Sequence, residues 1–242
     1  MSQTLSSNPL RYACGCAVGF YGSVIGKKII VALTGAMLVG FLAGHLSGNL
    51  LIYVGPEAIN EYAAWLKGLG AGLWAARISL LVALVLHVYT TISLVRRNRA
   101  ARGPNRYARK VTVQASKASR YMIVSGLTIL SFVVYHLLHF TFGFKNNYHD
   151  PNGPYWTEDG LHNVYQMVID GFSWWPASAF YIISMALLCW HLSHGVASIF
   201  QTLGLSSERT QPVIALLAKI FALVLFLAKA SIPVAVLLGL IN

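Results

Sequence analysis

Five long apolar stretches dominate the pattern of hydrophobic and polar positions along the chain. Each is poor in charged residues and reaches the roughly 20 apolar residues that one crossing of a lipid bilayer requires. The stretches cover residues 29–54, 73–95, 121–144, 175–203 and 213–241. Within lipid each must be a helix, because an isolated strand would leave its backbone groups unpaired. The sequence therefore predicts an all-α integral membrane protein with five transmembrane helices in a single membrane domain over residues 1–242.

Composition excludes a soluble globular enzyme. The 242 residues are 56% hydrophobic and 10% charged, whereas a soluble domain is about 25% charged. The three cysteines, Cys14, Cys16 and Cys189, form neither a disulfide framework nor a zinc set with the usual spacing. A secretory signal peptide is not expected, because the first apolar run begins only at Ile29 and is too long for one.

The basic residues predict the orientation. The net charge is +11, and nine of the 18 lysines and arginines lie in residues 96–120, a loop without an acid. Further basic residues and no acid precede the first span, while six of the seven acids lie in the two other connections. By the positive-inside rule, the N-terminus and this loop face the cytoplasm and the C-terminus faces outside. The charge thus indicates topology, with anionic lipid headgroups as further partners of the loop, and not nucleic-acid binding.

The outer connection between the third and fourth spans is the longest one outside. It contains turn-forming residues at 150–154. Residues 161–169 are expected to form a short amphipathic helix on the outer surface.

Six of the eight histidines fall within the apolar stretches, where an ionisable side chain is a functional candidate by default. Counted at about 1.5 Å per residue, His45 and His136 lie roughly 25 and 24 Å from the inner face. His87 lies roughly 13 Å from the inner face and His191 roughly 22 Å from the outer face. Four consecutive spans thus give an outer and an inner pair of histidines, separated by roughly 10 Å along the membrane normal.

A pair of histidines from two helices at one depth suits a haem that is held by an imidazole on each face. Two pairs predict two stacked b haems within a bundle of the first four spans, as an electron path across the membrane. Gly35 stands ten residues before His45, Gly126 stands ten residues before His136, and each glycine follows a hydroxyl residue. Both glycines would lie in the inner half, where a residue without a side chain lets a flat ring approach the helix.

Other interpretations of the histidines compete. A single membrane histidine is often a helix–helix hydrogen-bonding group, but this explains poorly why four successive spans hold one at paired depths. His139 and His194 share a helix face with His136 and His191, so His194 is an alternative ligand and His139 is a candidate for a quinone site. Zinc is disfavoured, because the spans hold almost no carboxylate or thiolate. The two remaining histidines, His149 and His162, are expected to be solvated in the outer loop.

The order of these histidines along the five spans resembles that in the di-haem cytochrome b subunit of succinate:quinone oxidoreductases. This cytochrome b558 family anchors succinate dehydrogenase and fumarate reductase in the membrane. The resemblance covers about residues 25–240 and rests on five spans with one such histidine in each of the first four. The matching segments are Thr34-Gly35 through His45, residues 48–51 and 60–63, Ser125-Gly126 through Tyr135-His136, and His191 through residues 201–204.

The resemblance implies that His45 and His136 ligate the haem distal from the cytoplasm, and that His87 and His191 ligate the proximal one. His191 lies 13 residues before Gly204, a spacing similar to that of the family's ligand. The implied partners are a flavoprotein and an iron–sulfur subunit on the cytoplasmic side of a bacterial cytoplasmic membrane, with menaquinone as the expected quinone. The chain has no dinucleotide fingerprint and no cysteine set for a cluster, so it would be the quinone-reactive subunit and would not itself oxidise succinate.

Two positions depart from the pattern of some family members. Lys67 stands where menaquinone-using members carry a glutamate, and Cys189 stands where others carry a glutamate linked to proton passage. The proton route of those members is therefore not carried over. The candidates for a quinone site are Glu61, Tyr62 and His139, with an exposed loop charge as the alternative for Glu61.

Lys229, deep in the fifth span, is expected to snorkel to the outer interface, with a haem propionate as the alternative partner. Arg97 and Arg120 are candidates to hold the proximal propionates. Two other functions compete with the one described. They are a di-haem anchor of a hydrogenase or formate dehydrogenase, in which other spans typically carry the histidines, and a haemless transporter or channel.

Overall fold

The computed structural model describes residues 18–103, 117–144 and 146–242, and these residues form helices and loops without a β-strand. Five helices are long and apolar enough to span a membrane. They are α2 (Val24–Asn49) with its continuation η1 (Leu50–Tyr53), α4 (Ala71–Ala101), α6 (Met122–His136) with η2 (Leu137–Thr141), α8 (Trp175–Thr202) and α9 (Gln211–Leu237). The predicted all-α membrane fold with five spans is confirmed.

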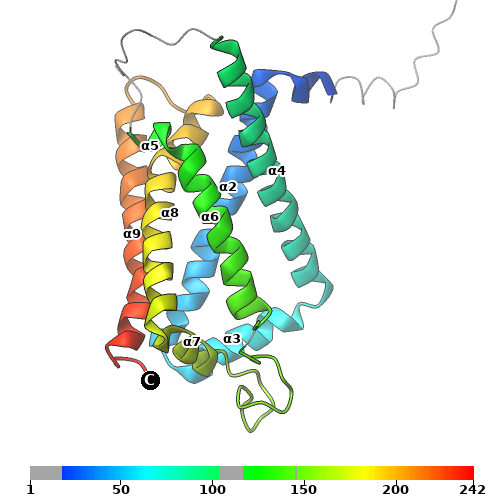
Figure 1. Cartoon of the computed structure of the whole chain (residues 1–242), viewed down its shortest axis with the longest axis vertical. Coiled ribbons are helices and arrows are strands. Elements are labelled where there is room, and N and C mark those ends of the chain that lie inside the picture. Colours follow the sequence, from blue (N-terminus) through cyan, green and yellow to red (C-terminus); the bar gives the residue numbers. More distant parts are fainter. Residues whose placement is uncertain (1–17, 104–116, 145) are drawn as a thin grey trace, which may run out of the picture.

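The four histidine-bearing helices form a ring (Figure 1). Helix α2 packs against α4 and α8, α8 packs against α6, and α6 meets α4 through a smaller contact. Helix α9 lies along α8 in the most extensive helix–helix contact of the described chain, and it also touches α2. The predicted bundle of the first four spans is therefore present, and the fifth span covers one side of it.

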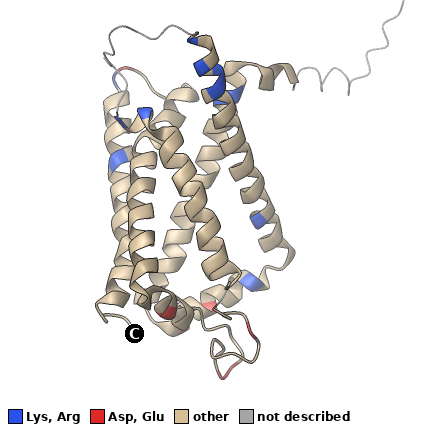
Figure 2. Ribbon diagram, viewed as in Figure 1, with Lys and Arg blue, Asp and Glu red and all other residues tan. Residues whose placement is uncertain are grey.

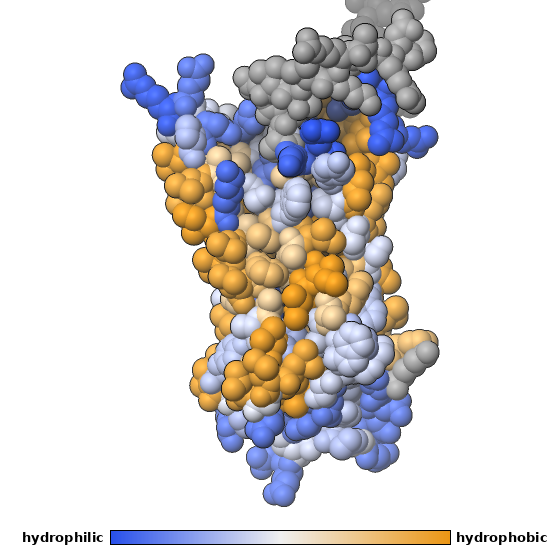
Figure 3. All heavy atoms as spheres, turned by 60° about the vertical axis from the view of Figure 1, so that its left-hand side comes forward, coloured by the Kyte–Doolittle hydropathy of each residue, from blue (hydrophilic) through white to orange (hydrophobic). Residues whose placement is uncertain are grey.

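Small residues bring α8 and α9 together. Ala222 of α9 is fully buried, as are Ser178 and Ser184 of α8. The hydrophobic effect does not drive helices together in lipid, so their association depends on close packing, and small residues permit it. The Ser178 hydroxyl donates to the Phe172 carbonyl at 2.6 Å, so its polar atom is paired. Large apolar side chains face outwards, and Figure 3 shows a hydrophobic band between two hydrophilic ends.

Most lysines and arginines lie at one end of the molecule and most acids at the other (Figure 2). The basic end carries the start of α2, with Lys27 and Lys28, and the last turns of α4 from Arg96 onwards; the acidic end carries the two outer connections, with Glu57, Glu61 and four other acids. This separation agrees with the predicted topology, while the assignment of the basic end to the cytoplasm stays a prediction. The described residues exclude residues 104–116 of the basic loop and residues 1–17, which contain Arg11, Cys14 and Cys16.

Two short helices cover the acidic end. Helix α3 (Pro56–Gly68) was not predicted, although Pro56 at its first position and Glu57 in its first turn are helix-start signals. Helix α7 (Val164–Ser173) replaces the helix predicted at 161–169. It begins later because Asn163 caps it, with a side chain that accepts from the Gln166 amide at 3.0 Å.

Asn60 joins these two helices. Its Nδ2 donates to Asn163 Oδ1 at 3.2 Å, and its Oδ1 accepts from the Tyr165 amide at 3.0 Å. Asn60 is buried, so both ends of its carboxamide are satisfied by α7 and its cap. These bonds join α3 and α7 into one layer that covers the acidic end of the bundle.

Candidate histidine sites within the bundle

The acidic-half pair consists of His45 on α2 and His136 on α6. The centres of the two imidazole rings are 5.8 Å apart. Two imidazoles that bind one metal ion from opposite sides, with metal–nitrogen bonds of about 2 Å, have ring centres about 6 Å apart. The separation of this pair therefore fits a shared iron.

A phenylalanine one turn before each histidine stacks on its ring. Phe41 lies 5.2 Å from His45 with an interplanar angle of 13°, and Phe132 lies 5.9 Å from His136 at 27°. Both phenylalanines stand six residues after the repeated glycine and four before the histidine. The internal repeat thus includes this phenylalanine as well as the glycine and the histidine, and these rings help to set the orientation of the imidazoles.

The basic-half pair consists of His87 on α4 and His191 on α8. Thr34 Oγ1 lies 3.2 Å from His87 Nδ1, and Ser125 Oγ lies 3.1 Å from His191 Nδ1. Thr34 and Ser125 are the hydroxyl residues that precede the repeated glycines. Each histidine of this pair is therefore held by the helix that carries a histidine of the other pair.

Hydrogen counting assigns the tautomer of His87. The Thr34 hydroxyl donates to the Ile30 carbonyl of its own helix at 2.7 Å. A hydroxyl has one hydrogen, so the Thr34 oxygen accepts from His87 Nδ1. Nε2 of the neutral ring then carries a free lone pair, which is the state in which imidazole binds a metal.

Ser125 Oγ has three neighbours at similar distances: the Tyr121 carbonyl at 3.1 Å, the Met122 carbonyl at 3.2 Å and His191 Nδ1 at 3.1 Å. If His191 presents Nε2, its Nδ1 donates to Ser125 Oγ, and the Ser125 hydroxyl donates to a carbonyl of its own helix. His191 makes this contact, and its choice over His194 as a ligand stays a prediction.

The repeated glycines lie directly against the imidazoles of the basic-half pair. A Cβ atom at Gly35 would stand 3.3 Å from His87 Cε1, and one at Gly126 would stand 3.3 Å from His191 Cε1. The ring beside each glycine is thus an imidazole, while the expected contact of these glycines with a haem stays a prediction. The ten-residue spacing from each glycine to the histidine on its own helix corresponds to about 15 Å along the helix axis.

Tyr181 of α8 connects two histidines of the acidic half. Its hydroxyl lies 3.2 Å from Nδ1 of His136 and 3.2 Å from Nδ1 of His139. With one hydrogen, the hydroxyl donates to one ring and accepts from the other. If His136 presents Nε2 to a metal, its Nδ1 donates to Tyr181, and Tyr181 donates to His139. His139 is buried in the π-helical turn η2, a conformation that is frequent at functional sites.

His45 and Lys229 share Asn49. When the Asn49 amide is oriented to satisfy its neighbours, its nitrogen donates to the His45 carbonyl at 3.2 Å and its oxygen accepts from Lys229 Nζ at 3.0 Å. In the opposite orientation of the amide, Asn49 Nδ2 instead lies 3.4 Å from His45 Nε2. Lys229 was expected to snorkel to the interface. Its ammonium ends instead at Asn49, because this amide provides an acceptor between α2 and α9.

The three quinone-site candidates have different surroundings. Glu61 is exposed, in line with the alternative of a loop charge. The ring of Tyr62 lies on Gly48, where a Cβ would overlap it, and it stacks with Trp65 at 5.9 Å. His139 packs against a different set of rings. The described contacts therefore do not gather the three candidates into one site.

Two basic side chains at the basic end have partners of their own. Arg97 donates to the Gly22 carbonyl at 2.6 Å, and the Lys27 ammonium bonds to Ser93 Oγ at 2.5 Å. Arg120 is exposed. Arg97 is therefore engaged by the backbone, and the expected role of Arg97 and Arg120 toward propionates stays a prediction.

His162 corrects the prediction for the outer loop. It was expected to be solvated, but it is buried, and its Nε2 bonds to the Tyr148 carbonyl at 2.8 Å. It is covered because Trp156 pairs with it in an isolated β-bridge and His149 stacks on its ring at 5.1 Å. Burial lowers the pKa of His162. His149 is exposed, as predicted.

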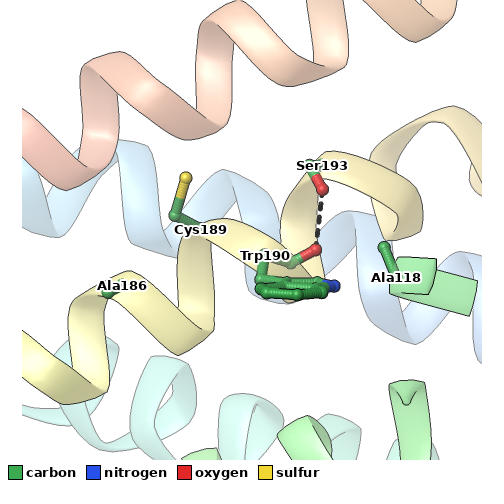
Figure 4. Close-up of a pocket in the computed structure, with 5 residues that line it drawn as sticks. All are labelled: Ala118, Ala186, Cys189, Trp190 and Ser193. Atoms are coloured by element: carbon green, nitrogen blue, oxygen red, sulfur yellow. Dashed lines mark hydrogen bonds between the residues drawn. The ribbon is translucent and has the colours of Figure 1, made fainter.

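A shallow pocket of about 370 Å³ lies on the outer face of α8, beside α5 (Lys117–Arg120). Figure 4 shows its lining, formed by Ala118, Ala186, Cys189, Trp190 and Ser193. The Ser193 hydroxyl donates to the Trp190 carbonyl at 2.7 Å, so it is satisfied by its own helix. This pocket is apolar and separate from the contacts of both histidine pairs.

No protein-family model, curated protein or solved structure matches the chain.

Proposed function

We propose that the chain is the membrane-anchor di-haem cytochrome b of a succinate dehydrogenase or fumarate reductase complex. In this role it carries electrons between an iron–sulfur subunit at the basic end and a quinone in the membrane. The observation that supports it best is the presence of two histidine pairs at two depths on four consecutive membrane helices. Helix–helix hydrogen bonding alone does not require such pairing.

The residues present fit two b haems. His45 and His136 would hold one and His87 and His191 the other, and each bound haem supplies a one-electron iron centre. The chain's own residues do the positioning. Acceptors on Nδ1 of a ligating histidine fix its ring and raise its basicity, and that is the role proposed for Thr34, Ser125 and Tyr181.

The two ends would serve different partners. The exposed Arg96, Arg99 and Arg102 form a positive surface at the basic end, which suits an acidic face of an iron–sulfur subunit. In the acidic half, Tyr181 and His139 place exchangeable hydrogens beside His136. Quinone reduction consumes protons as well as electrons, so we place the quinone site near His139.

Haem content per purified chain tests this proposal. A pyridine haemochrome assay with a dithionite-reduced spectrum is expected to give two b haems per chain. Absence of haem from chain purified out of haem-replete native membranes would overturn the proposal and favour a transporter or channel. Co-purification of a flavoprotein with succinate-reducible haem distinguishes the proposed complex from a hydrogenase or formate dehydrogenase anchor.

A further inference from the structure

Lys229 is a basic residue that α9, a helix without a histidine, places inside the bundle. It lies on α9 and is half-buried, and its ammonium ends 3.0 Å from the Asn49 amide oxygen. Lys219, ten residues earlier on the same helix, is exposed. The two lysines therefore differ in environment although they lie on the same helix and are the same residue type.

The ammonium of Lys229 has no carboxylate near it on the spanning helices. Helices α2, α4, α6, α8 and α9 contain no acid, and the described acids lie in the connections between them. Asn49 offers a neutral oxygen only. A charge taken out of water is costly unless an opposite charge accompanies it, so an anion from outside the chain would complete this site.

Asn49 places this cation beside the acidic-half pair. Asn49 stands four residues after His45, on the same face of α2 and one turn nearer to the acidic end. In the orientation that satisfies its neighbours, the Asn49 nitrogen donates to the His45 backbone carbonyl and the oxygen accepts from Lys229. A ligand held by His45 is therefore within reach of the ammonium if it carries an anionic group at its edge.

We propose that Lys229 and Asn49 form a carboxylate-binding site that holds a propionate of the haem between His45 and His136. This inference rests on the proposed function. An ammonium and a carboxylate form a charge-assisted hydrogen bond, which is stronger than a neutral one. Lys229 is thus a positioning residue that fixes which way the haem edge points and that stabilises the reduced iron through its positive charge.

Substitution of Lys229 gives the first test, in the intact complex. Lys229→Met removes the charge, Lys229→Arg keeps it, and Lys219→Met is the matched control on the same helix. The readouts are haem b per chain and the two midpoint potentials from an equilibrium redox titration. Lys229→Met is expected to lower the potential of the acidic-half haem, or to lose that haem, while the other haem is unchanged. Lys229→Arg and Lys219→Met should resemble the unaltered protein.

A wild-type protein without haem would refute the proposed function itself. With two haems in the wild-type protein, unchanged content and potentials in Lys229→Met would refute only the carboxylate site. If Lys229→Met does not assemble, Lys229→Gln decides by the same potential, which falls if the site exists and stays constant if it does not.

Chemical removal of the carboxylates gives a test that needs no assembled variant. Apoprotein in membranes from haem-deficient cells is titrated with haem b or with its propionate dimethyl ester. The ester is expected to bind the acidic-half site at least about tenfold more weakly, as loss of one partner of a desolvated charge pair implies. Equal binding of haem and ester at that site would overturn the proposal, as would a phospholipid phosphate found to occupy the lysine.

Discussion

The two histidine pairs are held by different chemistry. In the basic half, Thr34 and Ser125 contact the rings of His87 and His191 at nearly equal distances, and both hydroxyls also lie within hydrogen-bond distance of a carbonyl of their own helix. In the acidic half the partners are unlike each other. His136 bonds to a tyrosine that also contacts a second histidine, whereas His45 is next to an amide and a lysine.

This difference indicates a division of labour. The hydroxyls of the basic half cannot pass a hydrogen on without breaking a bond to their own helix, so a centre there is suited to electrons alone. The tyrosine of the acidic half, when it accepts from His136, donates its single hydrogen to a second titratable ring, His139. We therefore expect the acidic-half centre to couple electron transfer to protons, and the basic-half centre to be insensitive to them.

The largest effect is expected from the histidines themselves. His87→Ala and His191→Ala should each remove the same one of two haems, and His45→Ala and His136→Ala the other, because each haem would lose one of the two histidines that hold it. Haem content and the reduced spectrum of purified variants measure this. His194→Ala is the control and should retain both haems. Loss of a haem in His194→Ala with retention in His191→Ala would reverse the assignment in α8.

Gly35→Val should remove most of the basic-half haem and spare the other. A Cβ there would already stand 3.3 Å from His87 Cε1, so the added methyl groups must displace the ring. Gly40→Val on the same helix is the matched control, because no atom lies within 4 Å of its Cβ position. Haem content and the remaining midpoint potential separate the two variants. Equal behaviour of both would show that helix propensity, and not the contact, is responsible.

Thr34→Val should weaken haem binding at the basic-half pair by about 10–100-fold, the usual effect of losing a partner of a ligating histidine. The substitution keeps the shape of the side chain and removes only the hydroxyl. Transfer of haem to apomyoglobin measures the effect. Thr128→Val is the control, since the Thr128 hydroxyl bonds to the Val124 carbonyl of its own helix. A faster loss from the acidic-half pair would contradict the structure.

Tyr181→Phe is expected to give the smallest change, confined to the acidic half. Loss of the acceptor on His136 Nδ1 lowers the basicity of the ligand, which should raise the potential of that haem by about 40 mV for a hydrogen bond worth about 1 kcal/mol. Redox titration measures this shift. Tyr135→Phe removes a hydroxyl from the same aromatic cluster and should leave the potential unchanged. A shift in the basic-half haem instead would remove the contrast between the pairs.

The sequence predicts the spans and the histidine depths better than the partners of the histidines. An isolated apolar segment in lipid can pair all its backbone groups only as a helix, so the five membrane-spanning helices follow directly from the five apolar stretches. Thr34 could be associated with Gly35 from the repeat, but its contact with His87 depends on how α2 is rotated. Helices that are apolar on all sides give no pattern from which that rotation can be read. Tyr181 and the inward path of Lys229 were missed for this reason.

The repeat has a geometrical consequence. Helices α2 and α6 both run from the basic to the acidic end, and α4 and α8 both return. Residues 34, 35, 41 and 45 correspond to residues 125, 126, 132 and 136 at a constant offset. The two halves are thus related by an approximate two-fold axis along the membrane normal, as in transporters with parallel repeats. Each histidine pair takes one member from each half, so both pairs straddle this axis. Two ligands bound there would be aligned along the shortest route between the two ends. The contacts of Lys229 and Tyr181 have no counterpart in the other half and break this symmetry.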